Sequence, residues 1–328
     1  MPKKRGIMAI VTHALSSFLF DARKATLERK GALELGFGPI RECLIEEFSG
    51  LEVTLTASNG DTINALHFKG TMDKAIIYLH GNGCFYETSA SKPLYWLERI
   101  AETTNGERPH LFIFNPRGTG KSTGVTEPDL VAEDFKLAFE YLVEGFSVNP
   151  DHVALSGHSM GGFFGAHGAA RIQSLFPKNT INFLSDRSLS NLHDRVGIKV
   201  QNLGYSRISA FVVASSIHGT MSLLQWAKDP IEALEGLKGR VCIIYHKGDG
   251  VIPYEQSTHH ALTQVDREKT YFCIPMREKG GSAELSARAH NRDFTDEENA
   301  RIVVELKKML VIPRTSEESL LFPPEKLG

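Results

Sequence analysis

Gly157-His158-Ser159-Met160-Gly161, followed by Gly162, is the most informative stretch of this chain. It matches the pattern Gly-x-Ser-x-Gly, in which a serine sits on a strained turn between a strand and a helix. The apolar residues 153–155 predict a short buried strand before the turn, and the periodicity of residues 160–173 predicts a helix after it. The glycines have a steric reason, because larger side chains would collide with the strained serine backbone. This context favours a reactive serine over a flexible glycine loop.

The composition is that of an ordinary globular protein. The 328 residues allow one large domain or two small ones, and 41% of them are hydrophobic while 23% are charged. The formal net charge of −2 gives no sign of a nucleic-acid partner. Cys43, Cys84, Cys242 and Cys273 form no Cys-x-x-Cys pair and have no zinc-binding spacing. We therefore expect all four to be reduced, which predicts a cytoplasmic or other reducing location.

Residues 1–47 are expected to form a helical N-terminal extension. Lys3, Lys4 and Arg5 precede an apolar stretch, residues 7–20, that superficially resembles a secretory signal. Polar residues interrupt this stretch, no small-x-small cleavage site follows it, and it is too short to span a bilayer. Its apolar residues recur at helical spacing, which predicts an amphipathic helix continuing toward residue 30. Such a helix either packs on the domain surface or makes a peripheral membrane contact through residues 1–30.

From about residue 48 the pattern becomes regular. Residues 51–56 and 62–68 alternate polar and apolar side chains around Asn59-Gly60, which predicts a β-hairpin. Apolar runs then predict strands at 75–79, 111–114, 153–155, 181–185, 241–245 and 271–274, and helical periodicity predicts helices at 89–103, 130–143, 160–173 and 295–310. This order predicts an α/β fold over residues 48–310: a mostly parallel sheet with an antiparallel N-terminal hairpin and helices on both faces. Residues 311–328 would be a C-terminal tail.

The segment 188–236 is the least regular part of the chain. Two amphipathic stretches, 188–203 and 207–226, lie between consecutive predicted strands, which is too much chain for a single crossover. We expect one piece to be a covering helix and the rest to form a helical lid over the site. Residues 208–214 are apolar enough to form an extra strand instead.

A serine nucleophile needs a base, and the base needs a carboxylate that orients it. In a parallel sheet, ligand-binding residues gather beyond the carboxyl ends of the strands. Asp249 follows the predicted strand 241–245, and His290 follows the predicted strand 271–274. Their positions make Asp249 the candidate acid and His290 the candidate base for Ser159.

Both roles have rival residues. Asp186 also ends a predicted strand, and its structural role would be a helix cap or an ion pair with Arg187. His259 and His260 fall on a predicted helix after Pro253, where a solvated helix face would account for them. We therefore prefer Asp249 to Asp186, and His290 to the two helical histidines.

Two backbone amides are expected to form an oxyanion hole beside the serine. The amide of Met160 directly follows the nucleophile and supplies the first. The second is expected from His80-Gly81-Asn82-Gly83, which follows the predicted strand 75–79. Within this loop we prefer the Asn82 amide, with that of Gly83 next.

Taken together, these features resemble the α/β-hydrolase-fold serine hydrolases. Four matches occur in family order: residues 80–83, residues 115–122, residues 157–162, and Gly248-Asp249 with His290 downstream. Residues 115–122 are similar to the Asp-x-Arg-Gly-x-Gly-x-Ser loop of many members and depart from it at Asn115. The resemblance covers about residues 48–310.

Within this family, the chain most resembles the esterase and lysophospholipase group that includes BEM46-like proteins. The N-terminal extension and Glu317-Glu318 also give it a resemblance to hydrolases that bacterial pathogens export into host cells. The resemblance implies a serine hydrolase that cleaves a carboxylic ester, chiefly an acyl-lipid ester, through an acyl-enzyme on Ser159. Peptidase, thioesterase and acyltransferase activities on the same residues are alternatives. The expected partner is a small-molecule or lipid ester, with no nucleic acid and no metal or organic cofactor.

Residues 115–123 offer an alternative from another class. They follow a predicted strand and resemble the nucleotide-binding P-loop, Gly-x-x-x-x-Gly-Lys-Ser, with the first glycine missing. A P-loop needs a helix that starts at its lysine, whereas Gly124 and Pro128 interrupt the chain here. A binding module on an inactive hydrolase scaffold is a further alternative, against which the complete set of Ser159, Asp249 and His290 argues.

Overall fold

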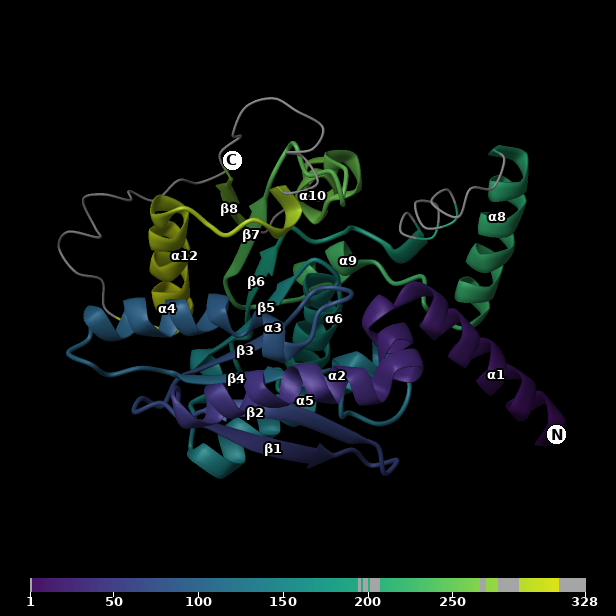
Figure 1. Cartoon of the computed structure of the whole chain (residues 1–328). Coiled ribbons are helices and arrows are strands. Elements are labelled where there is room, and N and C mark those ends of the chain that lie inside the picture. Colours follow the sequence, from purple (N-terminus) through teal and green to yellow (C-terminus); the bar gives the residue numbers. More distant parts are fainter. Residues whose placement is uncertain are drawn as a thin grey trace.

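An eight-stranded sheet runs through the residues that the computed structural model describes, which are 2–193, 196, 200, 207–265, 270–276 and 289–312 (Figure 1). Its strands are β1 (Gly50–Thr56), β2 (Thr62–Phe68), β3 (Ala75–Leu79), β4 (His110–Phe114), β5 (Val153–His158), β6 (Asn182–Asp186), β7 (Val241–Tyr245) and β8 (Phe272–Pro275), in the spatial order β1-β2-β4-β3-β5-β6-β7-β8. The predicted α/β class and the predicted strands are confirmed, with boundaries shifted by up to three residues.

The sheet is antiparallel at its start and parallel thereafter. β1 and β2 form the predicted hairpin, in register from Gly50 opposite Phe68 to Thr56 opposite Thr62, and β2 pairs antiparallel with β4. Gly60 in the connecting turn has a φ of 86°, which a residue without a Cβ adopts at no steric cost. The pairs from β4 through β3, β5, β6 and β7 to β8 are all parallel.

Helices cover both faces of the sheet, and its central strands β3, β4, β5 and β6 therefore bury side chains in both directions. On one face, Ile77 and Leu155 belong to a core completed by α5 (Pro128–Phe146), α6 (Met160–Leu175) and α9 (Pro230–Glu235). On the other face, Tyr78 packs with residues of α3 (Tyr86–Ser89), α4 (Ser91–Glu102) and α12 (Asp296–Met309). This double burial explains why the parallel strands read as continuous apolar runs.

The strand order brings loops distant in sequence to one edge. Leu79 at the end of β3 pairs with Gly157, and His158 at the end of β5 pairs with Asp186. Asp186 in turn pairs with Ile244 near the end of β7. The loops after β3, β5, β6 and β7 therefore lie next to one another at the carboxyl edge of the sheet, where ligand sites form in α/β folds.

Two N-terminal helices, α1 (Pro2–Leu19) and α2 (Asp21–Glu46), precede the sheet. They meet at Phe20, which is buried together with Leu15 and Leu19 against the core on the α6 face. Near the other end of α2, Arg41 forms an ion pair with the buried Glu87 of α3. The C-terminal part of α1 thus packs on the domain, whereas Ile10 is 70% exposed. No helix among the described residues is long and apolar enough to cross a membrane.

Residues 188–236 are only partly described. Residues 208–214 lie within α8 (Arg207–Leu223), so the alternative of an extra strand there is excluded. Leu189 reaches the site, and α9 packs against α6. Much of the predicted lid, including residues 201–206, lies outside the described residues, as do residues 313–328 of the predicted tail. The remaining short elements are η1 (Pro150–His152), η2 (Tyr254–Gln256) and α10 (Thr258–Thr263).

A buried histidine pair joins β2 to β4. His67 Nε2 lies 2.8 Å from His110 Nδ1, and His67 Nδ1 lies 3.2 Å from the Tyr141 hydroxyl. His67 has no exposed surface. Its burial, together with His110 and Lys69, lowers the pKa of His67 to about 3. His67 therefore stays neutral in the folded protein at neutral and mildly acidic pH.

We expect this histidine to make folding pH-dependent. Between its unfolded pKa of about 6.5 and its folded pKa of about 3, only the unfolded chain binds a proton at His67, so stability falls as pH falls. The expected contribution is about 1.4 kcal/mol per pH unit inside this window and nothing above it. Urea unfolding of the wild type and His67→Gln between pH 5 and pH 8 measures it, and equal slopes for the two proteins would contradict it.

Candidate active site

Ser159 occupies a sharp turn between β5 and α6. Its backbone has a φ of 55° and a ψ of −120°, a conformation that non-glycine residues rarely adopt. The turn needs glycines because the two elements approach closely. A Cβ on Gly157 would lie 2.2 Å from the Gly161 carbonyl oxygen, and one on Gly161 would lie 2.3 Å from that of Leu79. The predicted strand, turn and helix are therefore present, and they present the serine at the carboxyl edge of the sheet.

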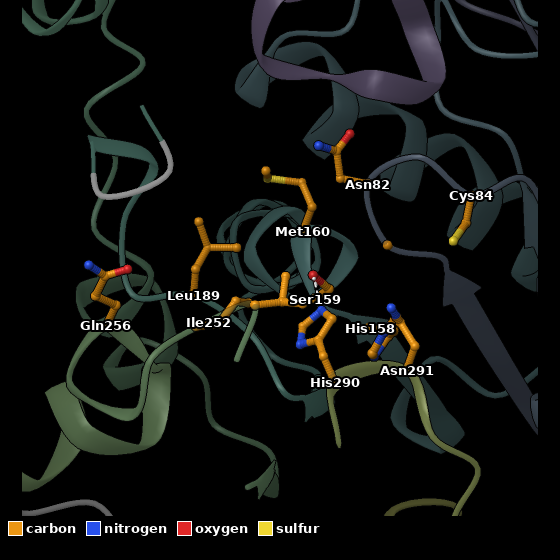
Figure 2. Close-up of a pocket in the computed structure, with 12 residues that line it drawn as sticks. Asn82, Cys84, His158, Ser159, Met160, Leu189, Ile252, Gln256, His290 and Asn291 are labelled. Carbon is orange, nitrogen blue, oxygen red and sulfur yellow. Dashed lines mark hydrogen bonds between the residues drawn. The ribbon is translucent and has the colours of Figure 1, made fainter. Parts of the chain in front are cut away.

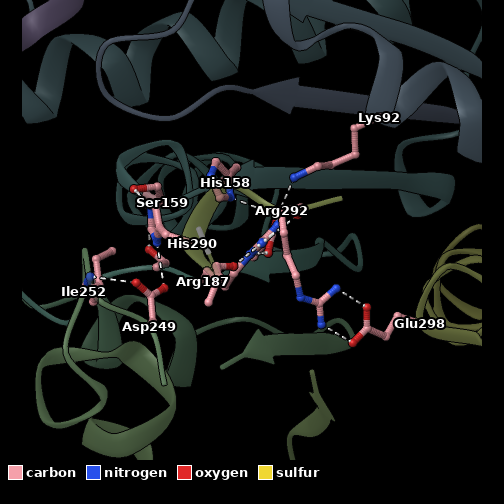
Figure 3. Close-up of polar contacts among 12 residues, drawn as sticks. Lys92, His158, Ser159, Arg187, Asp249, Ile252, His290, Arg292 and Glu298 are labelled. Atoms are coloured by element: carbon pink, nitrogen blue, oxygen red, sulfur yellow. Dashed lines mark hydrogen bonds and ion pairs between the residues drawn. The ribbon is translucent and has the colours of Figure 1, made fainter. Parts of the chain in front are cut away.

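His290 connects Ser159 to Asp249, although the three residues come from different parts of the chain (Figure 3). Its Nε2 lies 2.8 Å from Ser159 Oγ, and its Nδ1 lies 2.7 Å from Asp249 Oδ2. A carboxylate only accepts hydrogen bonds, so Nδ1 donates to Asp249, and in the neutral form of the ring this leaves Nε2 as the acceptor for the serine hydroxyl. The geometry leaves His290 able to take the hydroxyl proton.

Asp249 is held by the turn after β7. Its Oδ1 accepts hydrogen bonds from the amides of Val251 and Ile252, both at 2.9 Å, and this leaves Oδ2 for His290. The residue is 8% exposed. These bonds fix the orientation of the carboxylate, which in turn fixes the tautomer of His290.

The rival acid Asp186 has other partners. Its carboxylate binds Arg187 through both oxygens, at 2.7 and 3.0 Å, and also lies 2.9 Å from Lys92 Nζ. His158 Nδ1 lies 2.9 Å from the same carboxylate. The predicted ion pair with Arg187 is thus confirmed. Burial alone would raise the pKa of Asp186, but Arg187, Lys92 and His158 hold it well below the usual range.

Arg187 also holds the loop that carries His290. Its Nη1 donates to the carbonyl oxygens of Ala289 at 2.9 Å and Arg292 at 3.0 Å, on either side of the histidine. Arg292 is itself paired with Glu298 of α12 (Figure 3). This anchoring role was not predicted from the sequence, although an Asp-Arg pair at a strand end could have suggested it.

Lys92 and His158 also bind the Asp186 carboxylate near the serine turn, and neither was predicted from the sequence. His158 packs its ring 5.0 Å from that of His290, between centroids, and its burial beside Lys92 lowers the pKa of His158 to about 3. It is therefore neutral and donates through Nδ1 to Asp186. Lys92 could not have been found from the sequence, because it comes from α4 and lies far from Asp186 along the chain.

The two helical histidines lie elsewhere. His259 and His260 are on α10, as predicted. His259 is buried, with its ring 3.5 Å from that of Tyr245 between centroids and a hydrogen bond to the Tyr254 hydroxyl. The expectation that it belongs to a solvated helix face is therefore wrong. The apolar ring surface of Tyr245 gives it a packing role.

Ser159 opens into a pocket that also contains the predicted oxyanion residues (Figure 2). The pocket has about 590 Å³ of empty space, a volume that includes open solvent at its mouth. Its apolar wall is formed by Met160, Leu189, Val251 and Ile252, and its polar groups include Asn82, Gln256 and Asn291. Among the described residues, neither the Asn82 amide nor the Met160 amide donates to another protein group. Both amides remain candidates for stabilising an oxyanion.

The P-loop-like segment does not have the geometry of a phosphate site. The helix after it, α5, begins at Pro128 and not at Lys121. Several amides of the segment are already used: Gly118 N donates to the Thr123 carbonyl, and Gly120 N donates to Thr26 Oγ1 of α2. Lys121 pairs with Glu52 of β1. The segment therefore acts as a structural loop that ties the sheet to the N-terminal helices.

Among the residues that the structure describes, no group of His, Cys, Asp and Glu side chains is arranged to hold a metal ion. None of the four cysteines forms a disulfide bond with another. Cys84 lines the pocket near Asn82.

Comparisons with known proteins give short sequence matches. No family model matches the chain. The protein F37A4.1 of Caenorhabditis elegans, described as uncharacterised, is 26% identical over 164 residues, which cover 47% of this chain and 32% of that protein. YfhR of Salmonella typhimurium, also described as uncharacterised, is 29% identical over 117 residues, or 34% of this chain and 37% of that protein. The matched region thus spans about a third of the length of these relatives.

Solved structures match over most of the chain. An α/β hydrolase from Vibrio vulnificus has a TM-score of 0.64 and 17% identity, covering 90% of this chain and 93% of its own. The Pyrococcus furiosus esterase Pf2001 has a TM-score of 0.57 and 14% identity over 80% of this chain and 91% of its own. A puromycin-hydrolysing peptidase of Mycobacterium tuberculosis has a TM-score of 0.54 and 17% identity, covering 80% of this chain and 40% of its own. The chain therefore has the α/β-hydrolase fold that its motifs predicted.

Replacing each of the two aspartates by asparagine tests which one serves His290. Asp249→Asn should slow the reaction of Ser159 with a fluorophosphonate by about 10³- to 10⁴-fold, because the histidine loses its orienting carboxylate. Asp186→Asn should lower stability by about 3–5 kcal/mol, since it leaves the buried Arg187 and the partly buried Lys92 without their partner, but should slow labelling of the folded protein by less than about tenfold.

Mass spectrometry of the labelled protein gives the rates, and thermal unfolding gives the stabilities of the same samples. A larger loss of labelling in Asp186→Asn than in Asp249→Asn would assign the acid role to Asp186.

Proposed function

We propose that this α/β-hydrolase-fold chain is a serine hydrolase that cleaves a carboxylic ester, with acyl-lipid esters as its main substrate class. One observation carries the proposal: His290 lies within hydrogen-bond distance of both Ser159 Oγ, at 2.8 Å, and Asp249 Oδ2, at 2.7 Å. A hydroxyl is a weak nucleophile until a base removes its proton, and this arrangement supplies the base and its orienting acid.

In the proposed reaction, Ser159 Oγ attacks the ester carbonyl carbon while His290 Nε2 accepts the hydroxyl proton. The imidazolium that forms keeps its Nδ1 hydrogen bond to the Asp249 carboxylate, which stabilises the new positive charge. His290 then passes the proton to the leaving alcohol as the tetrahedral intermediate collapses. The acyl-enzyme on Ser159 is hydrolysed by water, which His290 activates in the same way.

The amides of Asn82 and Met160 are proposed to stabilise the negative charge on the carbonyl oxygen. Both residues line the pocket beside Ser159, and both amides are free to donate. A donor aimed at the developing oxyanion contributes about 3–4 kcal/mol to lowering the barrier. These donors are backbone groups, so side-chain substitutions at either position leave them in place.

The walls of the pocket support an acyl substrate. Met160, Leu189, Val251 and Ile252 offer apolar contacts suited to an alkyl chain, while Gln256 and Asn291 offer polar contacts to a head group. An amide or thioester could enter the same pocket, so peptidase, thioesterase and acyltransferase activities are the competing outcomes of a substrate test. The esterase and peptidase among the similar structures have these different activities on one fold, which is why the fold alone does not choose between them.

Ser159→Ala should abolish both fluorophosphonate labelling and ester hydrolysis while leaving the melting temperature nearly unchanged. The serine hydroxyl is the only proposed nucleophile, and removing one oxygen from a small side chain perturbs the packing little. Persistent labelling of the variant would place the nucleophile elsewhere.

The wild type should hydrolyse p-nitrophenyl esters with kcat/KM rising with acyl chain length, because each buried methylene adds about 0.8 kcal/mol of transfer free energy. A lysophospholipid, an aminoacyl anilide and an acyl thioester are assayed beside them. A rate on the anilide or the thioester above the rates on all the oxygen esters would contradict the ester assignment.

A further inference from the structure

Two helices of this molecule, α1 and α8, contain basic residues and no acidic ones. Helix α1 contains Lys3, Lys4 and Arg5 but no carboxylate, and α8 contains Arg207 and no carboxylate. Aspartate and glutamate account for 39 of the 328 residues of the chain, so a helix of 17 or 18 residues would hold about two of them at the average frequency. A surface with this charge balance is complementary to an anionic partner.

The same helices expose large apolar side chains. Phe211 of α8 is 73% exposed and Leu223 is 79% exposed, and Ile10 of α1 is 70% exposed. Val212 and Met8 are exposed as well, at 56% and 42%. Single exposed apolar residues are common, but several on two helices that also carry only positive charge indicate a surface that contacts an apolar and anionic layer. We call these five side chains the α1–α8 surface.

The two helices meet close to the pocket. Phe20, at the end of α1, packs with its ring centroid 5.5 Å from that of Phe164 on α6 and 6.0 Å from that of Trp226, just after α8. Phe164 lies little more than one helical turn after Ser159. From this shared aromatic contact both helices project beyond the sheet on the same side of the molecule (Figure 1). The ends of the two helices therefore lie near the start of α6, the helix that follows Ser159.

We propose that the α1–α8 surface docks on an anionic lipid bilayer and so brings acyl-lipid esters to Ser159. This inference rests on the proposed esterase function for its purpose, although the docking itself requires no catalysis. Exposed Phe and Leu side chains insert at the interface, and the lysines and arginines are attracted to anionic headgroups. The attraction between exposed charges is screened by salt, so binding should weaken as ionic strength rises.

The test measures binding separately from activity. Full-length Ser159→Ala protein is sedimented with vesicles of phosphatidylcholine alone and with vesicles that contain about 30% phosphatidylserine. We expect at least tenfold tighter binding to the anionic vesicles, weakened by high salt. The pair Phe211→Asp and Leu223→Asp should reduce that binding at least tenfold, whereas Leu175→Asp, which changes a 51% exposed leucine at the opposite end of α6 from Ser159, should not.

Three results would overturn the docking inference. The first is that protein with the unaltered surface does not bind anionic vesicles, and the second is that Leu175→Asp loses as much vesicle binding as the pair Phe211→Asp and Leu223→Asp. The third is self-association in solution that this pair of substitutions abolishes, which would make the surface a contact between two copies of the chain. Hydrolysis of soluble p-nitrophenyl acetate by the protein with Ser159 intact is measured in parallel, so that failure of the docking is distinguished from failure of the proposed function.

The side chain of Asn82 points to a second and independent role for the N-terminal helices. Its Oδ1 accepts a hydrogen bond of 2.7 Å from the Asp21 amide, and its Nδ2 donates to the Leu19 carbonyl at 3.1 Å and to Asp21 Oδ2 at 3.0 Å. Phe20, the N-cap of α2, supplies no side-chain hydrogen bond to the helix. Asn82 therefore caps α2 from a loop more than sixty residues later, and it also bonds the end of α1.

These bonds connect the loop after β3 to a rigid anchor. Leu19 and Phe20 are buried, so the α1–α2 junction cannot move without disturbing the core. The backbone amide of the same Asn82 is the proposed oxyanion donor, and stabilisation by such donors requires them to be held in place before the reaction. We infer that the Asn82 side chain is a positioning residue, which fixes its own amide by binding the α1–α2 junction. This inference also rests on the proposed function.

Asn82→Ala should lower kcat for a short soluble ester at least tenfold while changing KM less than threefold, because the misplaced amide acts on the transition state. Asp21→Ala removes one of the three bonds and should give a smaller loss of kcat in the same direction. Thr26→Val is the matched control, since it breaks a 2.9 Å hydrogen bond between α2 and Gly120 in another loop, and its kcat should stay within twofold of the wild type.

An unchanged kcat in Asn82→Ala, or an equal loss of kcat in Thr26→Val, would overturn the positioning role. If Asn82→Ala does not fold, the comparison of Asp21→Ala with Thr26→Val decides, and equal kcat values in those two variants would overturn it. A wild type without esterase activity would instead refute the proposed function.

Discussion

The backbone conformation of Ser159 is the constraint on which the rest of the structure depends. With a φ of 55°, the serine can join β5 to α6 only if the two elements almost touch, and this requires glycine at positions 157 and 161. The close approach aims the hydroxyl away from the sheet and places the start of α6 beside the loop after β3. Ser159, which is the proposed nucleophile, the Met160 amide and the Asn82 loop are therefore brought together by one strained turn, whose cost the surrounding core offsets.

Asp186 ends β6 and Asp249 follows the neighbouring strand β7, and their different surroundings give the two carboxylates different roles. Asp249 receives two backbone amides and the His290 ring, whereas Asp186 is surrounded by Arg187, Lys92 and His158. A carboxylate committed to the buried Arg187 and the partly buried Lys92 is a poor partner for His290, and it serves better as the centre of a rigid cluster. Through Arg187 this cluster binds the carbonyls on both sides of His290, so both aspartates act on the histidine, one directly and one through its loop.

The N-terminal helices are more closely integrated with the domain than a surface extension would be. Their junction bonds the Asn82 side chain, Thr26 bonds Gly120, and Arg41 pairs with Glu87 on α3. Each contact ends on a loop or short helix that follows a strand at the carboxyl edge of the sheet. The helices thus stabilise loops at this edge of the sheet, while apolar side chains such as Ile10 remain exposed.

The sequence by itself determined the succession of strands and helices along the chain, the hairpin at Gly60 and the strained serine turn. It also determined that Asp249 and His290 each follow a strand. These features follow from local rules: side-chain periodicity, glycine at crowded or left-handed positions, and polar residues just after apolar strands. It did not determine that residues 208–214 form a helix, that His259 is buried, or that Lys92 and Arg187 surround Asp186. Those outcomes depend on which distant segments the sheet order brings together, and on burial that no single segment encodes. Only the tertiary structure could place Asn82 against the α1–α2 junction and Arg187 against the loop of His290.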